Sequence, residues 1–361
     1  MNKKLKVIQL IDSLHPGGAE MMAVHIANEL VTHDTIESHL CATRLEGDLK
    51  AKMEQSVGYV CLNKQRVLDL KAFKMLNAYI KVHQISIIHA HSSSYFIGFL
   101  MKLWNPNLKL IWHDHYGKSD YLDTRSTFPL AFISNYFHTV IAVNMRLKAW
   151  SEQHLNAKDV KYLPNFAVFT KHKTKETLLK GKEGKRIVCL ANLRPQKDHL
   201  NLLKAFKRIQ LTHPDWTLHI VGQNLNDGYA QEIKSFITSH NLSNHVFLYG
   251  SRNDVEFILS QATIGVLASN SEGLPVSLLE YGLAKLPTVV TDVGECAEVV
   301  KHNTSGIIVP SQDEKVLAAG LTTFIENEHK RKLFGVALFK RVNENYSKTN
   351  FIKTLLNIYT S

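Results

Sequence analysis

The sequence predicts an α/β protein built from two doubly wound parallel-sheet domains, and three observations support this prediction. The chain has 361 residues, which is more than one hydrophobic core usually serves. Short apolar runs alternate with segments whose apolar residues recur at helical spacing, a pattern typical of parallel sheets wrapped by helices. This alternation stops in a polar, strongly charged stretch and then starts again.

The first domain is predicted over residues 1–167. It begins with the buried-strand pattern "KLKVIQLIDSL" (4–14), the turn "HPGGAE" and the helical pattern "MMAVHIANELV" (21–31). Similar strand, turn and helix patterns recur within residues 85–155. Residues 168–186 are polar and have no strand character, so they are predicted to be a linker.

The second domain is predicted over residues 187–344. Its strand patterns run from "IVCLANL" (187–193) to "SGIIVP" (305–310), with helical patterns between them. The final helix, predicted within residues 345–361, is apolar on one side. It either packs back on the first domain or closes the second.

Composition narrows the classes of protein. Hydrophobic residues make up 45% and charged residues 21%, as in soluble globular enzymes. No apolar run approaches the roughly 20 residues that span a bilayer, and the basic N-terminus leads into a first strand instead of a signal peptide. The four cysteines form no CxxC pair, so we expect packing roles in a reduced compartment. The formal charge of +11 favours anionic partners such as nucleic acid, phosphorylated substrates or acidic lipid; a solubilising surface is the alternative.

Four segments follow predicted strands, where open doubly wound sheets bind ligands. The first is "HPGGAE", in which Gly17 and Gly18 lack a Cβ and allow a ligand phosphate or sugar to approach the backbone. A tight structural turn explains the same residues equally well. No G-x-G-x-x-G fingerprint follows any predicted strand, which counts against a dehydrogenase.

The second segment type is a pair of histidine doublets, His89 with His91 and His113 with His115. Residues two apart on a strand point to the same face, so each doublet presents two imidazoles together. Zinc binding in a metal hydrolase is one reading. Against it, the chain has no H-E-x-x-H segment, and with 19 histidines some doublets arise by chance.

The third segment is "LANLRPQKDHLNLLKAF" (190–206). Asn192, Arg194 and Lys197 lie between a strand and a helix there. Two cations beside a helix N-terminus suit a diphosphate, whose charge they hold as it leaves. Two solvated loop cations are the alternative.

The fourth segment is "SNSEGLPVSLLEYGLAK" (269–285). Pro275 suits the first turn of a helix, which places Glu272 in the loop above it and Glu280 about 7.5 Å further along the axis. The intervening backbone can offer N–H groups to an anion; it comprises Gly273, Leu274, Pro275 and Val276. Acids on both sides of a phosphate cradle suit a nucleotide sugar, which has hydroxyls at both ends and phosphates in the middle.

The combination of "GGAE", "ANLRPQKDHLNLLKAF" and "SNSEGLPVSLLEYGLAKLPTVVTDVGECAEVV…SGIIVP" resembles the retaining glycosyltransferases of family four. The resemblance covers nearly the whole chain and is most specific in the second domain. It implies the GT-B fold, in which two Rossmann-like domains face a central cleft. The second domain then binds the donor and the first binds the acceptor.

The resemblance also implies roles for individual residues. Glu280 would hold the donor ribose, Glu272 the transferred sugar and Lys197 the diphosphate. The remaining positions match in the same way: Gly17 and Gly18 would close over the phosphates, Arg252 ends the "LYGSR" stretch of the base pocket, and the catalytic-site histidine aligns best with His115, then His113, with His91 as a neighbour.

One position departs from the family. Many members have Gly-Arg where this chain has Ala191-Asn192, and we expect Arg194 to supply the guanidinium. No carboxylate is placed as a nucleophile, so front-face displacement is favoured over a covalent intermediate. In that reaction the leaving diphosphate takes the acceptor proton, and stabilisation of its charge supplies most of the rate enhancement.

The expected function is therefore transfer of a sugar from a UDP- or GDP-sugar to a glycan or lipid-linked hydroxyl, with retention of configuration. Neither a cofactor nor an obligatory metal is expected, and nucleic acid is not an expected partner. Bacterial surface polysaccharide assembly in the cytoplasm is the expected setting, with a peripheral contact to acidic lipid as a further hypothesis. The alternatives are a nucleotide-sugar epimerase, a non-catalytic binding protein of the same fold, and a metal-dependent hydrolase.

Overall fold

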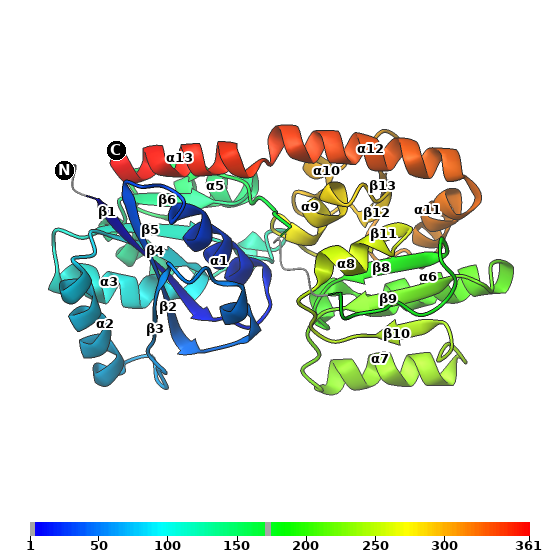
Figure 1. The fold of residues 1–361 in the computed structure, drawn as a ribbon, viewed down its shortest axis with the longest axis horizontal. Helices are drawn as coiled ribbons and strands as arrows, with labels where there is room; N and C mark the ends of the chain where they lie inside the picture. The colour runs from blue at the N-terminus through cyan, green and yellow to red at the C-terminus, as the bar shows by residue number, and fades with distance from the viewer. Residues whose placement is uncertain (1–3, 170–174) are drawn as a thin grey trace. The chain divides into compact units, whose positions relative to one another are not determined.

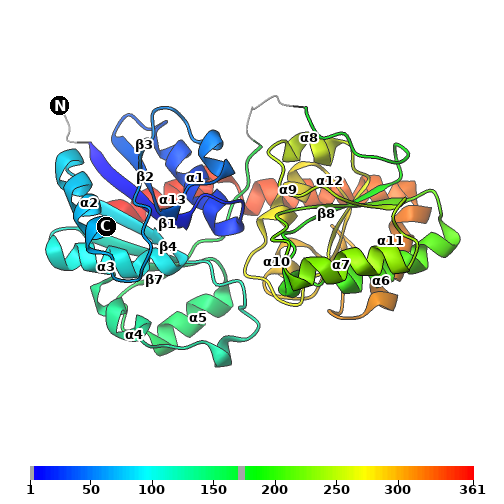
Figure 2. The same cartoon turned by 90° about the horizontal axis from the view of Figure 1, so that it is seen from below.

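The computed structural model describes residues 4–169 and 175–361, and the chain divides into two compact units (Figure 1). The first unit runs to Asn165 and also includes Lys348–Ser361, and the second unit is Phe166–Ser347. Each unit contains one parallel sheet with helices on both sides of its strands (Figure 2). The predicted α/β class with two doubly wound domains is confirmed.

The first unit contains a seven-stranded sheet in the order β3-β2-β1-β4-β5-β6-β7. Its strands are β1 Leu5–Ser13, β2 Ile36–Leu45, β3 Gly58–Cys61, β4 Ile87–His91, β5 Lys109–Asp114, β6 Thr139–Ala142 and β7 Val160–Tyr162. Its helices are α1 Gly18–Leu30, α2 Leu70–His83, α3 Tyr95–Trp104, α4 Leu130–Ile133, α5 Met145–His154 and α13 Lys348–Thr360. The strand order reverses between β1 and β4, which marks the switch point where such sheets bind ligands.

The second unit contains a six-stranded sheet in the order β10-β9-β8-β11-β12-β13. Its strands are β8 Arg186–Leu190, β9 Thr217–Val221, β10 Val246–Leu248, β11 Ile264–Leu267, β12 Thr288–Thr291 and β13 Ile307–Val309. Its helices are α6 His199–Thr212, α7 Gly228–Ser239, α8 Val255–Ser260, α9 Val276–Leu283, α10 Cys296–Val299, α11 Glu314–Glu326 and α12 Glu328–Asn345. Its switch point lies between β8 and β11.

Both sheets are buried on both faces, which explains why their strands read as continuous apolar runs. In the first unit one face packs against α2 and α3 through residues such as Ile8, Leu10 and Leu110. The opposite face packs against α1 through Ile11 and Leu40.

The last helix, drawn red in Figure 1, belongs to the first unit. On α13, Phe351, Leu355 and Tyr359 are buried. The chain therefore returns to its first sheet, one of the two arrangements that the apolar face of this helix allowed.

Residues 170–174 of the predicted linker lie outside the described residues. The part from 175 onward packs on the second unit, since Thr177 and Leu179 are buried and the Asp254 carboxylate accepts hydrogen bonds from the amides of Glu176 and Thr177. Arg186 already begins β8.

Cys41, Cys189 and Cys296 are buried free thiols, and Cys61 is partly exposed. Within residues 4–169 and 175–361, no helix has both the length and the apolar character needed to cross a bilayer.

Candidate active site

In the second unit, the loops that follow β8 and β11 meet at the switch point through an ion pair. The Lys197 ammonium lies 2.6 and 2.7 Å from the two carboxylate oxygens of Glu272, and the Ser269 hydroxyl donates to the same carboxylate at 2.6 Å. Glu272 is 4% exposed, so its charge is largely removed from water. The structure thus brings together two of the predicted site residues, Lys197 and Glu272.

The loop that carries Lys197 has its own backbone supports. Pro195–Lys197 forms one 3₁₀ turn, and Asp198, with φ of 45°, caps α6 by accepting a hydrogen bond from the Asn201 amide. The Asn270 amide donates to the Gln196 carbonyl at 2.8 Å and joins the two loops. The position of Lys197 is therefore fixed by local hydrogen bonds as well as by its partner.

The Glu272 loop needs a glycine beside it. Gly294 has φ of 52°, a conformation that L side chains rarely adopt, and a Cβ there would collide with the carbonyl groups of Glu272 and Gly273. The next amide, of Glu295, donates to the Gly273 carbonyl at 3.0 Å. This close approach holds the acidic loop against the segment that follows β12.

A buried tyrosine fixes α9 to the sheet. The Tyr281 hydroxyl accepts a hydrogen bond from the Leu190 amide at 2.7 Å and donates to the Val266 carbonyl at 3.1 Å. Burial raises the pKa of Tyr281 well above its ordinary value. Gly265 leaves room for the ring, since a Cβ there would lie 2.9 Å from it.

Pro275 directly precedes α9, close to its predicted place in the first turn. The four residues of the expected amide cradle, Gly273 to Val276, are buried, and Glu280 is partly exposed one turn into the helix. These placements agree with an acid on either side of a helix start.

The remaining predicted residues of the second unit are more exposed. The Asn192 side chain accepts a hydrogen bond from the Gln223 amide at 2.8 Å, so it acts on the neighbouring loop. Arg194 is exposed at the start of the 3₁₀ turn. Arg252 is exposed and donates to the Ser251 carbonyl at 3.1 Å.

In the first unit, Gly17 caps α1 and Gly18 is its first residue. The Glu20 carboxylate lies over Gly17, so closely that a Cβ on Gly17 would collide with it. A ligand phosphate at this turn would therefore meet a negative charge unless the Glu20 side chain turned away.

The four histidines lie together on one face of the first sheet. His91 is in register with His113 across β4 and β5, and Gln9 is in register with His89 across β1 and β4. Because paired residues in parallel strands point to the same face, and residues i and i+2 share a face, these side chains form one cluster. His115 directly follows β5 and is partly exposed.

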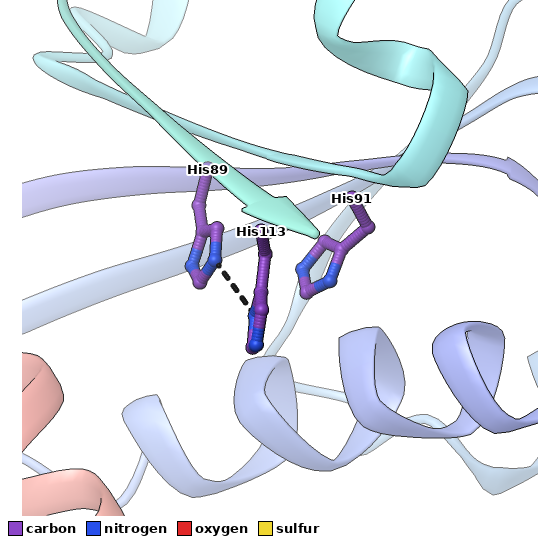
Figure 3. A group of neighbouring side chains, drawn as sticks. All are labelled: His89, His91 and His113. Atoms are coloured by element: carbon purple, nitrogen blue, oxygen red, sulfur yellow. Dashed lines mark hydrogen bonds between the residues drawn. The ribbon is translucent and has the colours of Figure 1, made fainter. Parts of the chain in front are cut away.

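Three of these histidines, shown in Figure 3, offer nitrogens that lie within 4.8 Å of one another. Their ring planes are nearly parallel, since those of His89 and His91 differ by 17° and those of His89 and His113 by 18°, and Nε2 of His89 already faces Nδ1 of His113 at 3.2 Å. Zinc requires nitrogen lone pairs aimed at one point about 2.0–2.1 Å away, and lone pairs lie in the ring planes. This arrangement suits hydrogen bonding between the rings better than metal coordination.

Several residues of these sites were not predicted from the sequence: Gln9, Ser269, Tyr281 and Tyr359, whose hydroxyl lies 2.7 Å from Nδ1 of His89. Gln9 could have been singled out from the sequence, because it is the one polar residue within the apolar run "VIQLI" of the first strand. The other three depend on contacts between distant segments, and no local pattern identifies them.

Comparison with known proteins finds a matching family model for each half of the chain. The family model described as "Glycosyl transferases group 1" matches residues 170–340, and the model described as "Glycosyltransferase Family 4" matches residues 16–168.

Three curated bacterial relatives illustrate the range of similarity. The UDP-Gal:alpha-D-GlcNAc-diphosphoundecaprenol alpha-1,3-galactosyltransferase of Escherichia coli is 26% identical over 70% of each chain. The exopolysaccharide phosphotransferase SCO2592 of Streptomyces coelicolor is 27% identical over 57% of this chain but only 22% of its own length. The lipopolysaccharide core biosynthesis mannosyltransferase LpcC of Rhizobium leguminosarum is 22% identical over 50% of this chain and 52% of its own.

Among solved structures, Alr3699/HepE of Anabaena, crystallised with UDP and glucose, superposes with a TM-score of 0.81. It covers 99% of both chains at 18% identity. At that identity the likeness concerns the fold.

Proposed function

Because the chain belongs to the group 1 glycosyltransferases and has their GT-B fold, we propose that it transfers a sugar from a nucleotide-diphospho-sugar to an acceptor hydroxyl. The observation that carries this proposal is the buried Lys197–Glu272 pair at the switch point of the second sheet. A nucleotide sugar has a diphosphate for the cation and sugar hydroxyls for the carboxylate. Both groups of the pair therefore have a use in the same ligand.

The pair also indicates how the donor binds. Lys197 and Glu272 neutralise each other, so a diphosphate has to compete with the carboxylate for the ammonium group. The sugar hydroxyls can then donate to the carboxylate oxygens and replace the hydrogen bonds that it loses. In this proposal Glu280 binds the ribose, and the exposed Arg194 turns toward the diphosphate.

We propose retention of configuration by front-face displacement. As the bond between the anomeric carbon and the phosphate oxygen breaks, negative charge grows on the diphosphate, and Lys197 stabilises it. The acceptor oxygen forms the new bond to the anomeric carbon on the same face, and its proton passes to that same phosphate oxygen. Fixed charges contribute most where charge develops, and we propose that these residues supply them without an obligatory metal or other cofactor.

The UDP seen in the Anabaena relative supports a uridine donor for this chain, with a guanosine donor as the second choice. The relatives that build lipopolysaccharide and diphosphoundecaprenol-linked sugars support a glycan or lipid-linked acceptor. Assembly of a bacterial surface polysaccharide in the cytoplasm is the setting we propose.

A thermal-shift screen against UDP, GDP and their sugars tests the donor, because a ligand that binds only the folded protein raises its melting temperature. We expect UDP to raise it and Glu272→Gln to reduce the additional shift given by the sugar. The matched control is Glu314→Gln, which removes the charge of a partly exposed acid of the same unit from its pair with Arg208. No shift with any nucleotide would contradict the proposed function.

Turnover separates the proposal from its rivals. A transferase releases UDP faster when acceptor is present, whereas an epimerase converts the donor without acceptor and a binding protein does neither. Activity that survives a chelator supports the metal-independent mechanism. Activity that depends on stoichiometric zinc would favour the metal hydrolase instead.

We also propose that the first unit touches the inner face of the membrane. Beyond its basic residues, it exposes Trp104 at the end of α3 and Phe128 and Phe132 near α4. Aromatic side chains with apolar bodies are typical of membrane interfaces. Binding to anionic vesicles should weaken in Phe128→Ala/Phe132→Ala and stay unchanged in Leu211→Ala, which removes an equally exposed apolar side chain from the second unit. Equal binding by both variants would contradict this contact.

A further inference from the structure

Six buried or partly buried polar groups of the first unit form one continuous line of hydrogen bonds, which we call the histidine chain: His115, His91, Gln9, Tyr359, His89 and His113. The spacings along it are 3.0 Å (His115 to His91), 2.9 Å (His91 to Gln9), 3.2 Å (Gln9 to Tyr359), 2.7 Å (Tyr359 to His89) and 3.2 Å (His89 to His113). Figure 3 shows the last of these bonds as a dashed line between neighbouring rings. The histidine chain joins strands β1, β4 and β5 to the C-terminal helix.

The imidazoles of this chain are neutral near pH 7. Burial lowers the pKa of His89 to about 3, and it holds the pKa values of His91 and His113 well below their ordinary value. Burial also lowers the pKa of the partly exposed His115 to about 3. A neutral imidazole has one N–H donor and one bare nitrogen, so each ring donates on one side and accepts on the other.

The amide of Gln9 sets the direction on one side of Tyr359. Its Nε2 group donates to the Tyr359 hydroxyl, which leaves its Oε1 to accept. His91 must therefore donate to Gln9 through Nε2–H, and its Nδ1 is the bare nitrogen. His115 then donates to that nitrogen through its own Nε2–H.

The other side follows from the same hydroxyl. Tyr359 has a single O–H, and since Gln9 donates to its oxygen, that proton is available for Nδ1 of His89. His89 then donates through Nε2–H to Nδ1 of His113. All five bonds run in one direction, and the line ends at Nε2 of His113, which is buried and finds no acceptor within the described part of the chain.

We propose that Tyr359 and Gln9 are positioning residues that fix the tautomer of His115, 244 residues away from Tyr359 in the sequence (359 minus 115). In this arrangement His115 carries its proton on Nε2 and keeps a bare Nδ1, which can accept a hydrogen bond from a ligand hydroxyl but cannot donate one to a phosphate oxygen. As far as catalysis is concerned, the inference rests on the proposed function. The tautomer itself does not depend on it.

Because each inner group of the histidine chain donates one hydrogen bond and accepts another, the direction of one bond fixes the direction of all the others. Reversing one ring alone would place two N–H groups or two lone pairs face to face at about 3 Å and would leave buried polar groups unpaired, which is unfavourable. Only two arrangements satisfy every inner bond, and they differ by a rotation of the Gln9 amide and of the Tyr359 O–H together with the tautomer of every ring. Removing the hydroxyl uncouples the two halves.

Two-bond 1H–15N spectra of 15N-histidine-labelled full-length protein test the inference without an activity assay. We expect the His115 signal, identified by its loss in His115→Gln, to show the Nε2–H form in the wild type. In Tyr359→Phe the ratio of the two tautomers of His115 should change by about tenfold, because one net hydrogen bond is worth about that factor. Gln9→Met, which keeps the volume but removes both polar groups, should have the same effect on His115 and should also change the spectrum of His89, because the amide no longer sets the direction of the Tyr359 O–H.

The matched control is Tyr79→Phe. It removes a tyrosine hydroxyl that lies 2.9 Å from Nδ1 of His39, in the same unit but outside the histidine chain. It should alter the His39 signal only. An Nδ1–H form of His115 in the wild type, or a His115 ratio that stays the same in both Tyr359→Phe and Gln9→Met, would overturn the inference. So would stoichiometric zinc in purified protein, because the metal would occupy the lone pairs that the chain uses.

The catalytic consequence has its own readout. Tyr359→Phe should lower kcat/KM for the donor about tenfold and leave the affinity for UDP unchanged, since UDP lacks the sugar. Unchanged kcat/KM in the presence of altered spectra would overturn the positioning role. If the wild type transferred no sugar at all, the proposed function would fail while the spectra still decided the tautomer.

Discussion

The buried ion pair of the second unit gives a quantitative prediction. Replacing Lys197 by Met removes the cation but keeps most of its apolar volume, and it leaves the Glu272 carboxylate, 4% exposed, without the ammonium that neutralises it. Breaking a buried pair from one side costs about 3–5 kcal/mol. We expect the lower end of that range, about 3 kcal/mol, because the Lys197 side chain is 18% exposed and the pair is therefore partly screened by water.

Glu272→Gln should cost less. The lysine that remains is the more exposed partner and can be hydrated, and glutamine keeps an acceptor for the Ser269 hydroxyl. We expect a loss of about 1–2 kcal/mol, in the range of one unsatisfied polar group. The double variant Lys197→Met/Glu272→Gln removes both charges, so its loss should be smaller than the sum of the single losses by about 1–2 kcal/mol.

Calorimetry of the full-length chain measures this cycle, since the two units each have a core and can melt separately. For a unit of this size, 1 kcal/mol shifts the melting temperature by roughly 2–4 °C, so Lys197→Met should lower the transition of the second unit by about 6–12 °C. Transfer activity should be lost in all three variants, including the most stable of them. Additive losses in the cycle, or a single Lys197→Met loss below about 0.5 kcal/mol, would show that the pair is not the buried, coupled contact described above.

Two further predictions concern the surroundings of the sites. Gly294→Ala should destabilise the second unit by about 2 kcal/mol or more and reduce transfer, because its Cβ would collide with the Glu272 loop. The control is Gly184→Ala, which has φ of 78° and open space around it, so it introduces the backbone strain alone and should cost only about 1–2 kcal/mol. Equal losses in calorimetry would contradict the close approach at Gly294. In the first unit the pKa of His89 is lowered, so the unfolded chain binds a proton that the folded chain excludes below about pH 6.5, and stability falls as the pH drops toward 3. Between pH 7 and pH 5 this one residue should lower the free energy of unfolding of the first unit by about 2 kcal/mol. Urea unfolding followed by tryptophan fluorescence measures this in the Trp216→Phe variant, because its remaining tryptophans all lie in the first unit. A urea midpoint that is the same at both pH values would refute the prediction.

The fold class was predictable because strand and helix periods are local properties of the sequence. The strands around Ile8, Ile88 and Val188 consist mainly of apolar residues, and that pattern needs no knowledge of their neighbours. Strands β2 and β3 and helix α2 were not singled out, since the sequence of β2, "IESHLCATRL", mixes charged and apolar residues near the edge of the sheet.

The sites were predictable in part, for the same reason. Doublets two residues apart placed His89 with His91, and the Gly-Leu-Pro turn placed Glu272 at the start of a helix. The partner of each could not be predicted: Lys197 and Glu272 are 75 residues apart, and Tyr359 is 270 residues from His89. Contacts of that range depend on strand order and on where the last helix packs, and no local pattern encodes either.

Polar groups are buried at both switch points, but they are stabilised in different ways. In the second unit a full charge is balanced by a full charge, so under the proposed function an anionic ligand would displace one partner, and its binding would be coupled to the position of both Lys197 and Glu272. In the first unit the groups of the histidine chain are neutral, and hydrogen bonds that run in one direction satisfy them except at the terminal Nε2 of His113. A neutral, directional chain imposes no charge on its ligand but dictates which atom donates. Charge selectivity is therefore expected to reside in the second unit, and the orientation of hydroxyl groups in the first.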